Sequence, residues 1–125
     1  MKNDSQIARE FVATGVCRSC PVIDMHGHYG PFRGIYLPRP WAEGMIETMD
    51  RSGVACILCS SHASLVDPER GNREMAEVVR RYPGRFYAYR TVNPNYPEKA
   101  REEVARFDED QGFVGFKFHP RGHSY

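Results

Sequence analysis

The sequence lacks the features that mark membrane, secreted and nucleic-acid-binding proteins. Its longest apolar run, residues 54–59, is far shorter than the roughly 20 residues needed to cross a bilayer. The 17 Lys and Arg against 16 Asp and Glu leave a formal charge of +1, without the basic surface that phosphate backbones require. Asp4, Arg9 and Glu10 interrupt the stretch where a secretory signal would be apolar. We expect a cytoplasmic protein with no membrane or nucleic-acid partner.

The spacing of the cysteines argues against a four-thiolate zinc site. The four cysteines form two C-x-x-C pairs. Cys56 and Cys59 fall in a strand-like run, where residues three apart face opposite sides of a sheet. Cys17 and Cys20 fall in an expected loop and could chelate a metal or form a redox pair, but no partner ligands are visible. We expect all four to be reduced, ordinary buried or half-buried residues.

What the chain does contain is an alternation of strands and helices. With 125 residues and 41% hydrophobic content it suits one small packed domain at most. Apolar runs and helical periodicity predict four β/α units with a period of about 30 residues, which is typical of a parallel sheet. We expect strands at 21–26, 54–61, 85–92 and 113–120, and helices at 41–51, from 72 to 82 and from 97 to 111, after a short amphipathic helix near 7–12.

This alternation predicts an α/β fold, with residues 1–20 as an extension and residues 21–125 as the first half of a (β/α)8 barrel. The fourth strand has no covering helix after it, so we expect a truncated chain. A flavodoxin-like module with an open sheet is the alternative, but no G-x-G-x-x-G or phosphate loop follows the first strand. In a half barrel, helices would cover the outer side only, and Val22, Leu58 and Phe118 would meet water where they point inward.

The strongest chemical signal is the segment Asp24-Met25-His26-Gly27-His28 at the carboxyl end of the first strand. Residues two apart on a strand share a face, so His26 and His28 can offer two imidazoles to one cation. Gly27 lets the backbone bend toward the metal, and Asp24 could support the pair from one step deeper. The carboxyl ends of parallel strands are where such folds place their active sites.

The residues VIDMHGH at 22–28 and GFVGFKFHP at 112–120, with His123 and Tyr125 after them, resemble the amidohydrolase superfamily. The resemblance is to its branch of amidohydrolase-related metal-dependent hydrolases, which also holds decarboxylases of the aminocarboxymuconate-semialdehyde type. It spans residues 21–125 and implies a distorted eight-stranded barrel whose first-strand histidines, here His26 and His28, bind a divalent metal, most simply zinc. Family members take further histidines and a catalytic aspartate from later strands, so the catalytic residues are expected outside this chain.

The resemblance implies a metal-dependent hydrolase in which metal-activated water attacks an amide, ester or related bond of a small molecule. A non-oxidative decarboxylase of the same family is the first alternative. A non-catalytic fragment, stable only as a homo-oligomer or within a longer protein, is the second.

Other polar residues are weaker candidates. Lys117 and His119 share a face of the fourth strand and are expected to contact substrate; in some branches of the superfamily a carboxylated lysine at this strand bridges two metals. His62 follows the second strand and is expected to be an exposed loop histidine. The charge-rich segment 98–110 is typical of a solvated helix face, with Lys99 and Glu103 at helical spacing.

Overall fold

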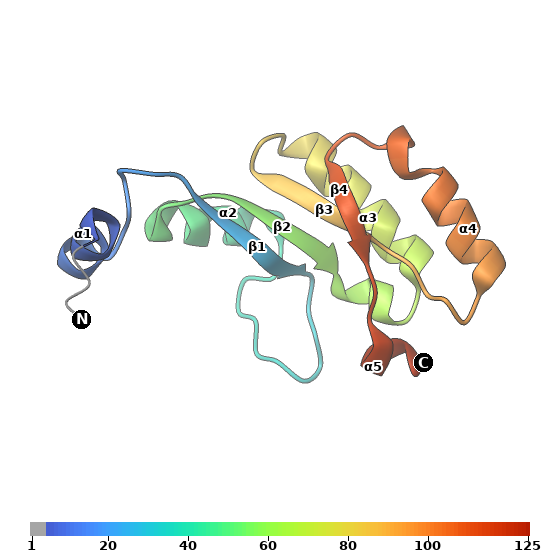
Figure 1. Cartoon of the computed structure of the whole chain (residues 1–125). Coiled ribbons are helices and arrows are strands. Elements are labelled where there is room, and N and C mark those ends of the chain that lie inside the picture. The colour runs from blue at the N-terminus through green and yellow to red at the C-terminus, as the bar shows by residue number, and fades with distance from the viewer. Residues whose placement is uncertain (1–4) are drawn as a thin grey trace.

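A computed structural model describes residues 5–125 as a four-stranded parallel sheet, as the sequence predicts (Figure 1). The strands are hydrogen-bonded in chain order, β1-β2-β3-β4. No helix in this range is long and apolar enough to cross a membrane. The elements are β1 (Val22–Tyr29), β2 (Val54–Ser61), β3 (Phe86–Thr91) and β4 (Phe113–Lys117), with α1 (Gln6–Thr14), α2 (Ala42–Ser52), α3 (Pro68–Arg81), α4 (Pro97–Ala105) and α5 (Pro120–His123), and short 3-10 turns η1 (His62–Leu65) and η2 (Phe107–Glu109).

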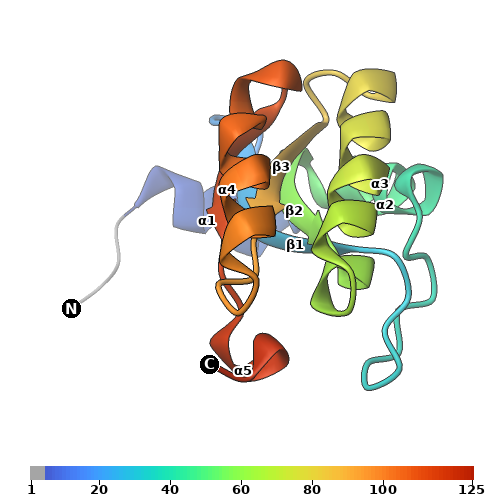
Figure 2. The same ribbon diagram turned by 90° about the vertical axis from the view of Figure 1, so that its right-hand side faces the viewer.

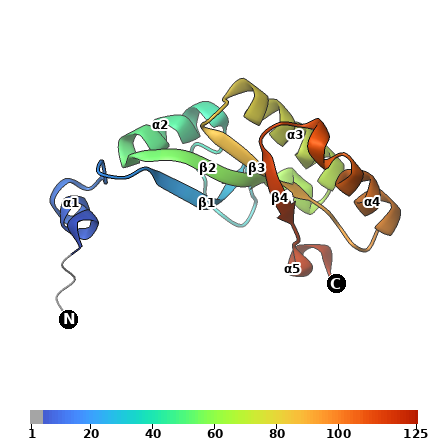
Figure 3. The same cartoon turned by 45° about the horizontal axis from the view of Figure 1, so that its top comes forward.

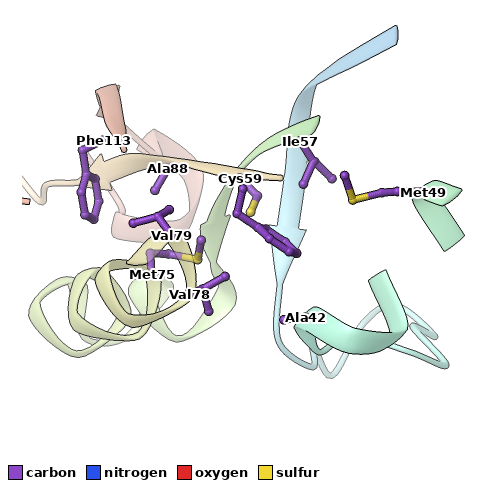
Figure 4. Close-up of a cluster of buried hydrophobic side chains, with 10 residues drawn as sticks. Ala42, Met49, Ile57, Cys59, Met75, Val78, Val79, Ala88 and Phe113 are labelled. Atoms are coloured by element: carbon purple, nitrogen blue, oxygen red, sulfur yellow. The ribbon is translucent and has the colours of Figure 1, made fainter. Parts of the chain in front are cut away.

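Helices α2, α3 and α4 all lie on one side of the sheet, and the other side is bare (Figures 2 and 3). Alternate side chains of the strands therefore pack against the helices and form the core. Figure 4 shows Cys59 and Ala88 of the strands over Met75 and Val79 of α3, and Ile57 of β2 beside Met49 of α2. The sidedness predicted for half a barrel is confirmed.

Local capping chemistry moves two element boundaries from where the sequence placed them. Helix α3 starts at Pro68 instead of residue 72, because the Asp67 carboxylate accepts the Arg70 backbone N–H (3.1 Å) and proline suits the first turn. The expected cap, Asn72, is buried inside the helix. The fourth strand ends at Lys117 instead of residue 120, and Pro120 opens the short helix α5.

The bare face of the sheet is only partly exposed. Ile23 and Met25 on β1 are about half exposed, at 49% and 57%, and Phe118 beyond β4 is exposed at 53%. The expectation that Leu58 would meet water is wrong, because it is 8% exposed. Tyr89 on β3 explains this, since its hydroxyl crosses β2 to donate to the Met25 carbonyl on β1 (3.1 Å).

A buried ionic network ties α3, β3 and α4 together on the helix side. Arg90 is 2% exposed and donates to Glu103 Oε2 (2.9 Å) and Asp110 Oδ2 (2.6 Å), while its guanidinium lies over the Phe113 ring. Asn72 Nδ2 donates to the same Glu103 oxygen (2.7 Å). The prediction of a solvated helix face is therefore wrong for Glu103, which is buried and ion-paired.

Candidate functional site

His26 and His28 lie near the carboxyl end of β1, with their ring centroids 5.0 Å apart. Gly27 between them faces the helices, where an added Cβ would lie 2.4 Å from Ile57 Cδ1. Only glycine fits this packing, and the two flanking histidines therefore project to the bare face of the sheet. The two rings are neighbours, as the sequence predicts, and their binding of one shared cation stays a prediction.

His28 is held in its neutral form. Burial lowers the pKa of its imidazole to about 4, and the nearby His62, His26 and Lys117 add to the effect. A neutral imidazole keeps the lone pair that a metal ligand or hydrogen-bond acceptor must offer. At neutral pH this ring is available as a ligand without losing a proton first.

Lys117 on β4 reaches across the bare face to His26 on β1. Its Nζ lies 3.2 Å from His26 Nε2, although β1 and β4 are the outermost strands. Three strand spacings would separate them by about 14 Å in a flat sheet, so the contact depends on the curvature of the sheet. The lysine ammonium has no acceptor, so it donates, and a cationic group stands against the imidazole lone pair.

His62 belongs to the same cluster, which corrects the expectation of an exposed loop residue. It is 8% exposed, and its ring stacks on His28 and on Phe32, each at a centroid distance of 4.8 Å. Its Nδ1 lies 2.9 Å from the Gly30 carbonyl oxygen, which can only accept, so Nδ1 carries the proton. In the neutral form of the ring, Nε2 of His62 is then an acceptor. Sequence spacing gave no sign of this contact, which depends on the path of the loop after β1.

The remaining histidines and Asp24 have structural partners. His119 caps α5, and its Nδ1 accepts the Gly122 N–H (2.8 Å). His123 is buried, with Nε2 3.2 Å from the Ser64 carbonyl oxygen. Asp24 accepts the backbone N–H of His26 (2.9 Å), and the pairing of β1 with β2 is irregular between Asp24 and Gly27. The aspartate therefore supports the backbone of the motif, and no bond from it to either ring is present.

A cavity of about 460 Å³ adjoins the cluster at the carboxyl ends of the strands. Its wall includes His28, Phe32, His62, Thr91, Lys117 and His119, so it contains both residues expected to contact substrate. Thr91 is 2% exposed, and its Oγ1 has no hydrogen-bond partner within residues 5–125. A buried hydroxyl without a partner costs free energy.

The donor set fits a divalent cation only in part. Two neighbouring imidazoles are present and one of them is held neutral, but residues 5–125 contain no group of three or more His, Cys, Asp or Glu side chains placed to hold a metal. Catalytic sites normally supply three protein ligands. Among residues 5–125 the pair His26 and His28 therefore supplies two imidazoles, fewer than the three protein ligands of a usual catalytic metal site.

Comparisons with known proteins identify the fold. No family model and no curated protein matches the sequence. Among solved structures, a 2,6-dihydroxybenzoate decarboxylase complexed with 2,6-dihydroxybenzoate matches with a TM-score of 0.63 at 21% identity, over 77% of this chain and 38% of the other. The 5-carboxyvanillate decarboxylase of Novosphingobium aromaticivorans, with bound manganese, matches with a TM-score of 0.63 at 19% identity, over 77% and 41%. A dihydroxybenzoic acid decarboxylase from Polaromonas, with bound manganese and the inhibitor 2-nitroresorcinol, matches with a TM-score of 0.63 at 21% identity, over 77% and 37%.

These structural neighbours are TIM-barrel decarboxylases. The chain spans about two fifths of their length, so it has the fold of part of such a barrel. The predicted fold class is therefore confirmed. At this level of identity the likeness establishes the fold alone.

Proposed function

We propose that this chain belongs to the amidohydrolase superfamily and contributes to the active site of a metal-dependent, non-oxidative decarboxylase of small aromatic carboxylic acids. The observation that carries the proposal is the pair His26 and His28 at the carboxyl end of β1, with the Lys117 ammonium against the pair. Structural neighbours with bound manganese and aromatic acid substrates support the decarboxylase over the hydrolase that the sequence suggested first. They support a divalent ion, and give no preference for zinc.

His26 and His28 would hold the metal. A divalent ion there would bind an oxygen of the acid and stabilise the negative charge left when carbon dioxide departs. Lys117 Nζ now occupies the lone pair of His26 Nε2, so the ammonium and a metal at this nitrogen exclude each other. Release of Lys117 from His26 frees its charge for the carboxylate of the substrate.

The cavity wall supplies the other contacts. Phe32 offers an apolar face to an aromatic ring, and His62 Nε2 can accept a hydrogen bond from a ring hydroxyl. In the reaction the bond between the ring and the carboxylate breaks, carbon dioxide leaves, and a proton takes its place. We assign no residue of this chain as the proton donor.

The test measures metal content and carbon dioxide release by the whole encoded protein, because the chain spans only part of its neighbours' length. With manganese present we expect carbon dioxide release from dihydroxybenzoates and no hydrolysis of esters or lactones. The double variant His26→Ala/His28→Ala should lose bound metal and activity together. Metal retained by that variant, or ester hydrolysis without decarboxylation, would contradict the proposal.

The role of Lys117 is tested separately with a matched lysine control. Lys117→Met should retain the metal and raise KM about 10- to 100-fold, the cost of one charge-assisted hydrogen bond. Lys99→Met on the exposed side of α4 removes the same charge away from the cavity and should leave KM unchanged. Equal KM values in the two variants would rule out contact between Lys117 and the substrate carboxylate.

A further inference from the structure

The two C-x-x-C pairs, identical in spacing, have different structures. Cys56 and Cys59 lie three apart on β2, and Cys59 is fully buried in the core, whereas Cys56 is half-buried. Cys17 and Cys20 lie in the loop between α1 and β1, where the backbone turns and brings their Sγ atoms to 3.5 Å. The loop pair alone is placed for reaction between its own sulfurs. It lies at the amino end of β1, away from the histidine cluster.

We propose that Cys17 and Cys20 form a reversible dithiol–disulfide pair, independent of the proposed decarboxylase site. The sulfurs must approach by about 1.5 Å to reach the disulfide bond length. That movement is available to two side chains on a four-residue loop, because no strand pairing holds residues 17–20. The same closure on β2 would break the alternation of the strand.

The surroundings hold this loop in place while both thiols are reduced. The Glu10 carboxylate of α1 accepts the backbone N–H groups of Arg18 (2.7 Å) and Ser19 (3.2 Å) and the Ser19 hydroxyl. Cys17 Sγ is 3.6 Å from the same carboxylate. Since α1 buries none of its residues, these bonds are a main link between α1 and the rest of the fold. The reactive pair therefore sits at the junction of α1 with the barrel.

The two thiols have distinct roles in oxidation by a low-molecular-weight disulfide such as glutathione disulfide. Cys20 is half-buried and Cys17 is 7% exposed, so Cys20 meets the oxidant. Its thiolate attacks one sulfur of the oxidant, forms a mixed disulfide and releases one thiolate. Cys17 then loses its proton, attacks Cys20 Sγ and releases the second thiolate. The two thiolates released take up the two protons that the protein loses and become thiols, and the oxidant receives both electrons.

The setting admits the oxidant but slows its reaction. A cavity of about 470 Å³ opens over residues 16–21, with Arg18 and Arg51 in its wall to attract the carboxylates of glutathione. The hydrogen bond to Cys17, together with burial, raises the pKa of the Cys20 thiol above its ordinary value. Little Cys20 thiolate is then present at neutral pH, so its attack on the oxidant is slow. Such a pair equilibrates slowly with the redox potential of its surroundings and is not a rapid redox catalyst.

The proposal is tested by equilibrating the folded chain in glutathione redox buffers, trapping free thiols with N-ethylmaleimide and measuring intact mass. Disulfide formation removes two hydrogens, so we expect the oxidised chain, weighed before alkylation, to be about 2 Da lighter than the reduced chain. Trypsin cleaves after Arg9, Arg18 and Arg33, so the disulfide would join peptides 10–18 and 19–33. Cys56 and Cys59 share one tryptic peptide, 52–70, and serve as the internal control, which should stay reduced.

Proximity in the folded state also predicts an equilibrium effect. The oxidation constant should be about tenfold or more larger in the folded chain than in urea, where the 3.5 Å placement is lost. Cys20→Ser should abolish the joined peptides, and Cys56→Ser should leave them unchanged. Equal constants in buffer and urea, a glutathione adduct as the end product, or oxidation of the β2 pair instead would overturn the proposal.

Discussion

Loss of the Glu103 side chain on α4 is expected to cost a large share of the stability of the fold. Its Oε2 atom accepts from Arg90 (2.9 Å) and from Asn72 (2.7 Å), and Arg90 is 2% exposed. Glu103→Ala removes both acceptor contacts and leaves the guanidinium with Asp110 as its one remaining carboxylate partner in the network. Breaking a buried ion pair from one side costs about 3–5 kcal/mol of unfolding free energy. That is a large share of the stability of a small domain.

The measurement is urea unfolding followed by circular dichroism, with two further variants for comparison. Glu102→Ala, on the exposed side of the same helix, should change the unfolding free energy by no more than about 0.5 kcal/mol. Glu103→Gln keeps an acceptor oxygen without the charge and should lower the unfolding free energy by about 1–2 kcal/mol. This variant therefore tests the network even if Glu103→Ala does not fold. A loss below about 1 kcal/mol in Glu103→Ala would refute the view that this network holds α3, β3 and α4 together.

Three more predictions follow from packing and exposure. Gly27→Ala places a Cβ 2.4 Å from Ile57 Cδ1, and we expect it to lower the unfolding free energy by about 1–3 kcal/mol; an unchanged thermal melt would contradict this. Burial raises the pKa of Cys59 to about 12, so its thiol stays protonated at pH 8 and should resist iodoacetamide while Cys56 reacts, as peptide mass spectrometry would show; equal labelling would contradict this. The bare sheet face and the free strand edges should make the isolated chain associate. A monomeric mass in light scattering, together with no binding of a hydrophobic dye, would refute this prediction.

Sequence pattern was sufficient for the strand order and the sidedness of the sheet because both depend on local signals. The apolar run at 54–61 coincides with β2, and Gly53 ends α2 in the left-handed conformation that glycine favours (φ 71°). The start of α3 was mispredicted because a residue type that favours helix caps can also make tertiary hydrogen bonds. Asn72 is a favourable cap residue by type, but its amide exchanges hydrogen bonds with the Thr91 backbone, and Asp67 caps the helix instead.

The candidate site was predictable only along single strands. His26 and His28 could be paired from the two-residue period of β1, since that period is a local property of extended backbone. The contact of Lys117 with His26 joins residues 91 apart in sequence and requires a curved sheet, which no local pattern encodes. His62 was misplaced for the same reason, because its burial depends on the Gly30 carbonyl and the Phe32 ring from the loop after β1. Curvature and loop path therefore turn two ordinary polar residues into neighbours of the imidazole pair, and their chemistry becomes visible only in three dimensions.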